Sequence, residues 1–129
     1  MTHPEVESWT ISLPPGEKLL NLNQRVHWRT RDRITRQIRG DSMVLTRAAR
    51  VPHLDRATMT GVLHPHDRRR RDASNWMPSW KAMIDGVVDA KVLIDDDDAH
   101  LLSFTIIQGE PVRHGQLSLI IYRVEPEGL

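Results

Sequence analysis

The sequence contains no cysteine, so the chain can form neither disulfide bonds nor thiolate metal sites. This absence suits a reducing compartment. There is also no apolar run long enough to span a membrane, and the first residues lack the apolar segment of a signal peptide. We therefore expect a cytoplasmic protein without a membrane partner, whose metal ligands would be oxygen or histidine nitrogen atoms.

A strong charge of either sign is missing as well, because the formal net charge is only +1. Lysine is scarce: of the 18 basic residues, 15 are arginines and the others are Lys18, Lys81 and Lys91. Guanidinium groups bind phosphate oxygens in a bidentate manner, so this excess favours a nucleic-acid partner. The arginine bias of a GC-rich genome explains the excess equally well.

The 129 residues are expected to form one domain, residues 1–129, with a core that needs no cross-links. Alternation of apolar and polar residues predicts four strands, and helical spacing predicts two helices. The strands are expected over Trp9–Leu13, Ala57–Leu63, Leu101–Gln108 and Leu117–Val124, and the helices over residues 30–50 and from near Pro78 to Ala90. This is an α+β fold with a mixed sheet and two helices, in the order β-α-β-α-β-β.

Three details of this fold can be tested directly. The last two strands are joined by a short turn and are expected to pair as an antiparallel hairpin. Gly40 and Gly86 are expected to be weak points within the two helices. Trp28 lies in a loop expected over residues 17–29, where its ring could stack on a base. Since most tryptophans are largely buried, we expect Trp28 to close the edge of the core instead.

The stretch from Arg68 to His100 concentrates the residues suited to phosphate chemistry. Four arginines, Arg68–Arg71, run directly into Asp72, and four aspartates, Asp95–Asp98, follow the second helix. Arginines neutralise phosphates, and carboxylates hold the Mg²⁺ that phosphodiester chemistry often needs. The alternative for Asp95–Asp98 is a solvated acidic turn. A helix of about 13 residues spans about 20 Å, so the chain must fold back if the two groups are to meet.

Other polar residues of this stretch have both structural and chemical interpretations. The Lys81 ammonium could contact a phosphate or a leaving oxygen, or it could pair with Asp85 one helical turn later. Ser74 and Asn75 could cap the helix. Three histidines lack the spacing of a zinc site and are interpreted as polar loop residues; these are His64, His66 and His100.

The run RRRRD, the Asn that follows it, the helix with Lys and Asp, and the IDDD turn together resemble the RusA family of Holliday-junction resolvases. The resemblance is strong from Arg68 to Asp98. It extends weakly over most of the chain, through the ISLPP start and the stretch around Asn23 and His27. Members of this family are small homodimeric Mg²⁺-dependent endonucleases, often encoded by phages or prophages, which nick opposing strands at four-way DNA junctions.

The resemblance implies roles for individual residues. Asp72 matches the first acid of the family's D-x-D-N motif, Lys81 its catalytic lysine at a lengthened spacing, and Asp96 its third acid, which together would be catalytic. The metal ligands for Mg²⁺, or Mn²⁺ in its place, would be Asp72, Asp85, Asp95 and Asp96. The DNA-binding residues would be Arg68, Arg69, Arg70, Arg71, Asn75, Arg25, His27 and Arg29.

The resemblance implies a structure-selective endodeoxyribonuclease of DNA recombination and repair, a homodimer on branched DNA in a bacterial or phage-infected cell. Ser74 departs from the family, because the second acid of the motif usually stands there. This departure keeps open a protein that binds junctions or other nucleic acid without cutting them. A third interpretation is a general nucleic-acid-binding fold whose acidic turn has no chemical role.

Overall fold

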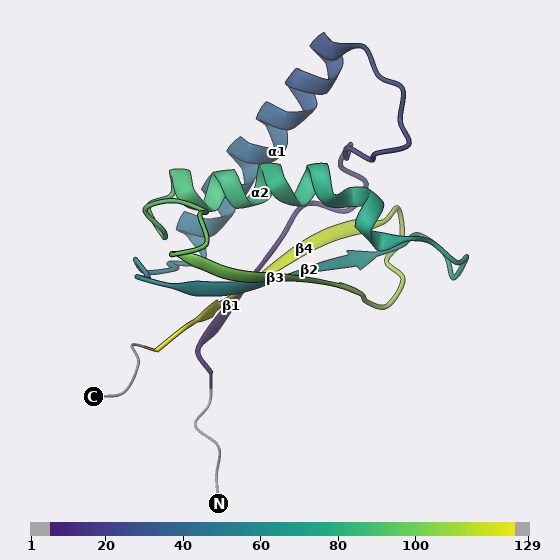
Figure 1. The fold of residues 1–129 in the computed structure, drawn as a ribbon. Coiled ribbons are helices and arrows are strands. Elements are labelled where there is room, and N and C mark those ends of the chain that lie inside the picture. The colour runs from purple at the N-terminus through teal and green to yellow at the C-terminus, as the bar shows by residue number, and fades with distance from the viewer. Residues whose placement is uncertain (1–5, 126–129) are drawn as a thin grey trace, which may run out of the picture.

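Two helices lie on one face of a four-stranded mixed sheet in the computed structural model, which describes residues 6–125 (Figure 1). The elements are β1 (Ser8–Ser12), α1 (Trp28–Ala48), β2 (Ala57–His64), the 3₁₀ turn η1 (Ala73–Trp76), α2 (Met77–Asp89), β3 (Leu101–Gln108) and β4 (Gln116–Arg123). The predicted α+β fold and its element order are confirmed. Neither helix of the described residues is long and apolar enough to cross a membrane.

The strands are arranged in the order β1-β4-β2-β3. β4 is antiparallel to both of its neighbours, β1 and β2, whereas β3 is parallel to β2. The predicted hairpin between the last two strands is therefore wrong, because β2 lies between them. A parallel pair needs a crossover connection, and α2 supplies it between β2 and β3.

The residues from 109 to 115 carry the chain past the end of β2. The Gly109 N–H donates to the Leu63 carbonyl at 2.8 Å, and the Val112 N–H donates to the Pro65 carbonyl at 2.9 Å. These bonds replace the hairpin turn that the sequence suggested. A connection of this length can join adjacent strands or cross one strand, so its length alone did not decide the pairing.

Trp80 of α2 is the centre of the core, with no exposed surface. Its indole N–H donates to the Ser118 carbonyl of β4 at 3.1 Å. Gly61 of β2 leaves space for the ring, since a Cβ there would lie 2.6 Å from a Trp80 ring carbon. These contacts fix α2 against the sheet, and they leave the next residue, Lys81, on the exposed side of the helix.

The seam between α1 and α2 requires Gly86. A Cβ at Gly86 would collide with the Arg39 carbonyl oxygen and with the Ser42 side chain. In the same seam the Ser42 hydroxyl donates to the Met83 carbonyl at 2.7 Å. Gly86 is thus a site of close helix packing rather than a weak point. Gly40 has no such neighbour within 4 Å, and α1 continues through it without a break.

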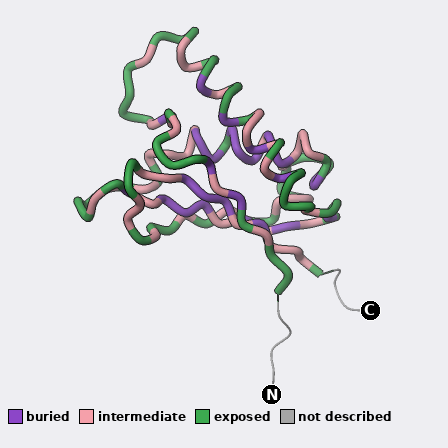
Figure 2. Tube along the Cα trace, turned by 180° about the vertical axis from the view of Figure 1, so that it is seen from behind, coloured by how far each residue is buried: buried purple, intermediate pink, exposed green. Residues whose placement is uncertain are grey.

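The N-terminal end of α1 projects away from the sheet (Figure 1). Buried positions of α1 begin only at Ile34, and the turns before it are exposed or partly exposed (Figure 2). Trp28, the first residue of the helix, is 67% exposed. The expectation that Trp28 closes the core is therefore wrong, because the core does not reach the first turns of α1. The loop predicted over residues 17–29 ends at His27.

Candidate active site

One side of α2 carries three charged residues at four-residue spacing, Lys81, Asp85 and Asp89. The opposite side is buried against the sheet and α1, so these three lie at the surface of the helix. The Lys81 ammonium donates to Asp85 Oδ1 at 2.9 Å. The ion pair expected between Lys81 and Asp85 is therefore present.

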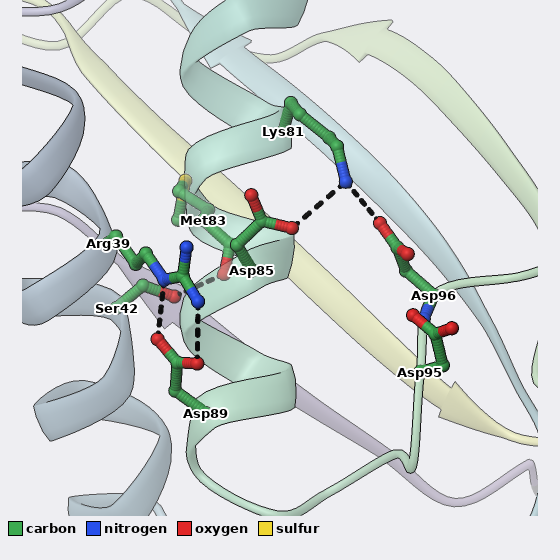
Figure 3. A network of polar contacts seen from close by, with 8 residues as sticks. All are labelled: Arg39, Ser42, Lys81, Met83, Asp85, Asp89, Asp95 and Asp96. Atoms are coloured by element: carbon green, nitrogen blue, oxygen red, sulfur yellow. Dashed lines mark hydrogen bonds and ion pairs between the residues drawn. The ribbon is translucent and has the colours of Figure 1, made fainter. Parts of the chain in front are cut away.

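The chain returns to Lys81 after α2 ends. Val92 and Leu93 are buried, and the Val92 carbonyl accepts a bond from the Leu54 N–H at 2.7 Å. This anchored segment directs the acidic turn back along α2, so that Lys81 also donates to Asp96 Oδ2 (Figure 3). The chain thus folds back after α2, but the contact that the structure shows for the acidic turn is with Lys81 and not with Asp72.

Lys81 bridges two carboxylates, Asp85 and Asp96. The bond that it donates to Asp96 holds the pKa of Asp96 below the ordinary value, and the bonds that it donates to Asp96 and Asp85 raise the pKa of Lys81. Asp95 lies beside them, with Oδ1 accepting the Asp96 N–H at 2.7 Å. Two carboxylates therefore share one ammonium, and Asp95 adjoins this group through the Asp96 backbone.

A different ion pair lies further along α2. Arg39 of α1 donates to both carboxylate oxygens of Asp89, at 2.6 and 2.8 Å (Figure 3). The pairing lowers the pKa of Asp89 and joins the two helices with a bidentate bond. This pair is balanced, one cation to one anion, and helix packing accounts for it.

Asp72 caps the turn η1. Its Oδ1 accepts bonds from the Ser74 N–H at 3.1 Å and from the Ser74 hydroxyl at 2.6 Å. Within residues 6–125, no three His, Asp or Glu side chains form a group that could hold a metal ion. Asp72, Asp85 and the acidic turn are therefore not gathered into one set, and the predicted four-ligand metal site stays a prediction.

The chemistry of the acidic residues fits Mg²⁺ nonetheless. Mg²⁺ binds oxygen atoms and often takes only one or two carboxylates, with water and phosphate oxygens completing its shell. Asp85 and Asp96 already share one positive group, the Lys81 ammonium. If Mg²⁺ binds here, Asp95 and Asp96 are the two carboxylates that would hold it, with water and phosphate oxygens completing its shell.

The arginine run has two kinds of members. Arg71 is only 15% exposed and stabilises its own turn, donating to Asp67 Oδ1 at 2.6 Å and to the Asp67 and Arg69 carbonyls. Arg68, Arg69 and Arg70 are exposed. These three can reach a phosphate without breaking a buried contact, whereas Arg71 would have to give up its bonds to Asp67.

The loop with the predicted DNA-binding residues is tied to the segment that follows Asp72. The Leu22 N–H donates to the Asn75 carbonyl at 2.8 Å. Ser79 of α2, which is fully buried, accepts from the Leu20 N–H at 2.6 Å and donates to the Leu20 carbonyl at 2.8 Å. Ser79 was missed by the sequence analysis, since a single helical serine gives no sign of a distant partner.

The remaining predicted DNA-binding residues gather at the start of α1. His27 caps the helix, its Nδ1 accepting the Arg29 N–H at 3.2 Å, and the Arg29 guanidinium lies over the Trp28 ring at 5.2 Å. Arg25 is exposed in the loop just before them. The exposed basic residues therefore form two groups, one just before and at the start of α1 and the other in the Arg68–Arg70 turn.

The other histidines have local partners. His64 Nδ1 contacts the Glu110 carbonyl at 2.8 Å, His66 lies 3.0 Å from Asp67, and His100 lies 2.5 Å from an Asp97 oxygen. His66 and His100 thus lie outside the strands and helices, as predicted, whereas His64 is the last residue of β2 and the prediction of a loop is wrong for it.

A hollow of about 340 Å³ lies between residues 17–18 and α1. It shares no lining residue with the Lys81 cluster or with η1. Its lining combines Glu17, Lys18 and Arg33 with Ile34 and Gln37.

Comparison with known proteins finds a similar sequence in a bacterium. A protein of Xylella fastidiosa (strain Temecula1), named "Uncharacterized protein", is 32% identical over 118 residues, which cover 87% of this chain and 74% of the relative. No protein-family model matches the chain.

Proposed function

We propose that this chain, which belongs to the same family as the Xylella fastidiosa protein, is a Mg²⁺-dependent endonuclease that cuts four-way DNA junctions. It would act in DNA recombination and repair, as the resemblance to RusA resolvases over Arg68–Asp98 suggests. The acidic residues bonded at Lys81 and the exposed arginines of the Arg68–Arg70 turn and of the start of α1 support this proposal.

One observation carries the proposal: Lys81 holds Asp96 ionised beside Asp85 and Asp95. A stable pair of structural charges needs only one carboxylate, as Arg39 and Asp89 show. The surplus of carboxylates, held next to a lysine and open to solvent, is the arrangement expected of a site that takes up a metal and a phosphate.

The residues would divide the work as follows. Arg68, Arg69 and Arg70 would neutralise phosphates of the junction arms. Lys81 would keep Asp96 ionised and would stabilise negative charge that develops on the phosphate. Bound Mg²⁺ would supply an activated water and neutralise that charge. Because two strands must be nicked, we propose a two-fold homodimer that supplies two such sites.

Asp72 provides the sharpest test of this function. We expect Asp72→Asn to lower single-turnover cleavage of a labelled four-way junction by roughly a hundredfold or more, because the charge that would help to hold Mg²⁺ is lost. Junction affinity should hold or rise slightly, since one negative charge beside a phosphate is removed.

The experiment uses the parent protein with Mg²⁺ and with EDTA, and thermal melting to verify the fold. The Asn side chain can still accept the Ser74 bonds that form the cap, so the variant should remain folded. A folded variant that cuts at the parent rate would remove Asp72 from the site. A parent protein that cuts no junction with Mg²⁺ or Mn²⁺ would contradict the proposed enzyme.

A second function, junction or nucleic-acid binding without cleavage, is favoured by the state of Asp72. Its Oδ1 already accepts two bonds from Ser74, the residue that replaces the second acid of the motif. A protein that binds a junction more tightly than a linear duplex, with no cleavage under either metal, would favour this function.

A further inference from the structure

Trp28 is exposed although tryptophan is costly to leave in water. Of the four tryptophans, Trp80 is fully buried and Trp9 and Trp76 are partly buried, whereas Trp28 is 67% exposed. No buried residue of α1 precedes Ile34, so Trp28 adds nothing to the core. Its position at the projecting end of α1 therefore leaves the ring available for a contact outside the chain (Figure 1).

The ring is held by its neighbours without being covered. His27 stacks beside it, with ring centroids 5.8 Å apart and planes inclined by 27°, and the Arg29 guanidinium lies 5.2 Å from the ring centroid. These contacts limit the orientations of Trp28 before any ligand binds. A side chain fixed in this way loses less entropy on binding than a free one.

The charges around Trp28 select a polyanion. Arg25, Arg29 and Arg33 are exposed, and the first turn of α1 contains no acid. The nearest acid of the helix, Asp32, is paired with Arg36 at 3.1 Å. A basic surface with an exposed aromatic ring fits a nucleic-acid strand, whose backbone binds the arginines while a base stacks on the ring.

A lipid surface is a poorer fit. A helix that lies in a membrane interface needs a sustained apolar face. Around Trp28, the first turns of α1 have the sequence WRTRDR and thus contain no second apolar residue. The loop before α1 is also bonded to η1, through the Leu22 N–H and the Asn75 carbonyl.

We infer that Trp28 stacks on an unpaired or unstacked base of the DNA, at the branch point of a junction. The inference rests on the proposed DNA substrate and adds a feature that selects it. Within a duplex both faces of each base are covered by neighbouring base pairs, whereas a branch point offers bases that can open. Trp28 would therefore favour branched DNA over linear duplex, while the arginines bind both.

The test measures binding to a four-way junction in EDTA, with 2-aminopurine placed either at the branch point or in the middle of an arm. The parent protein should change the fluorescence of the branch-point probe, and Trp28→Ala should abolish this change and weaken junction binding roughly fivefold to a hundredfold. Trp28→Phe should retain most of both effects. The salt dependence of binding should stay as in the parent, because no charge is removed.

Val44→Ala is the matched control, since Val44 is another exposed apolar residue of α1, 60% exposed, outside the proposed site. It should behave as the parent. If the parent binds and cuts junctions but Trp28→Ala matches it in affinity and probe fluorescence, only the stacking inference is overturned. If the parent binds no DNA at low salt, the proposed function fails as well.

Vesicles of phosphatidylserine and phosphatidylcholine form the last arm of the experiment. We expect the parent protein to bind these vesicles weakly, and Trp28→Ala should bind them equally weakly. Vesicle binding that depends on Trp28, together with junction binding that does not, would overturn the inference in favour of a lipid surface.

Discussion

Two carboxyl groups of this molecule have pKa values that are shifted in opposite directions. One is Asp96, which lies beside Asp85, and the other is Glu17, which lies beside Asp41. The pKa of Asp96 is held below its ordinary value because Lys81 donates a hydrogen bond to it. The pKa of Glu17 is raised to about 8 by its burial, and then by the hydrogen bond and the negative charge of Asp41. Both carboxylates have an acidic neighbour, but burial is the main cause of the shift at Glu17, whereas the bond from Lys81 is the main cause at Asp96.

The comparison shows why the number of acids is a poor guide to a cation site. Asp41 itself accepts bonds from Gln37, at 3.1 Å to each oxygen. With its pKa of about 8, Glu17 is largely protonated at neutral pH. Asp96 is fully ionised there, so the cluster at Lys81 holds its charge ready for a cation.

The largest expected effect is on catalysis at Asp96. Asp96→Asn should lower single-turnover junction cleavage by roughly a hundredfold or more, because it removes the carboxylate that Lys81 keeps ionised. Junction affinity in EDTA should be equal or slightly higher. Quenched-flow cleavage and fluorescence anisotropy provide the two measurements.

Asp97→Asn is the matched control for Asp96→Asn. Asp97 belongs to the same acidic turn, but its carboxylate bonds the Ala99 and His100 N–H groups and the His100 ring rather than Lys81. It should cut at close to the parent rate. Equal losses of rate in both variants would show that cleavage needs the charges of the turn in general. The contact between Lys81 and Asp96 would then not be what makes Asp96 necessary.

A smaller effect, on stability, is expected at Glu17. Between the unfolded pKa of 4.5 and the folded pKa of about 8, the folded protein keeps a proton that the unfolded chain has released. The stabilisation is complete below the unfolded pKa and is lost as the pH rises through about 8. Glu17→Gln cannot ionise, so it should be the more stable protein at pH 8.5.

The expected gain is on the order of 1 kcal/mol, less than the full shift implies because solvent reaches part of the side chain. Urea unfolding at pH 5 and at pH 8.5 measures it, and the two proteins should differ little at pH 5. Asp41→Asn should flatten the pH dependence only in part, since burial still acts on Glu17. Parallel stability profiles for the parent and Glu17→Gln would show that Glu17 ionises normally.

The smallest expected effect on stability is at Lys81. Lys81→Met would leave Asp85 and Asp96 without their cation, as Glu17 and Asp41 are, so the Asp96 pKa should rise. Carbon-13 NMR titration of the Asp96 carboxyl reports this change directly. An unchanged Asp96 titration would mean that Lys81 does not control its charge.

Global stability should change by less than about 1 kcal/mol, because the Lys81 side chain is 54% exposed. The sign depends on pH. In the parent, the lowered Asp96 pKa contributes stability that is present above the ordinary value of 3.8 and is lost as the pH falls through the folded pKa. Lys81→Met should therefore lose less stability between pH 5 and pH 3 than the parent does.

The order of helices and strands could be predicted from the sequence because each element carries its own periodicity. The pairing of the last two strands could not, because it depends on whether β2 has a free edge. β3 takes one edge of β2 through the α2 crossover, and β4 takes the other. Gly40 and Gly86 look alike in the sequence, and only the position of the second helix tells them apart.

The members of the site were easier to predict than their arrangement. Lys81, Asp85 and Asp96 stand out by residue type, yet their contact depends on the buried Val92 and Leu93 that direct the turn. Trp28 shows the opposite limit. The sequence indicated that its ring could stack on a base. Its exposure, however, depends on how far α1 extends past the core, and no local sequence pattern indicates that distance.

The place of β4 between β1 and β2 has a consequence for how the protein is made. Its partner Ser12 of β1 is 106 residues away from Ser118, and their hydroxyls meet at 2.7 Å. While a ribosome is still synthesising residues 116–123, β1 has no neighbour and β2 has an open edge. Native pairing must therefore wait until this segment leaves the exit tunnel, and nascent chains that stall earlier would expose two strand edges to aggregation.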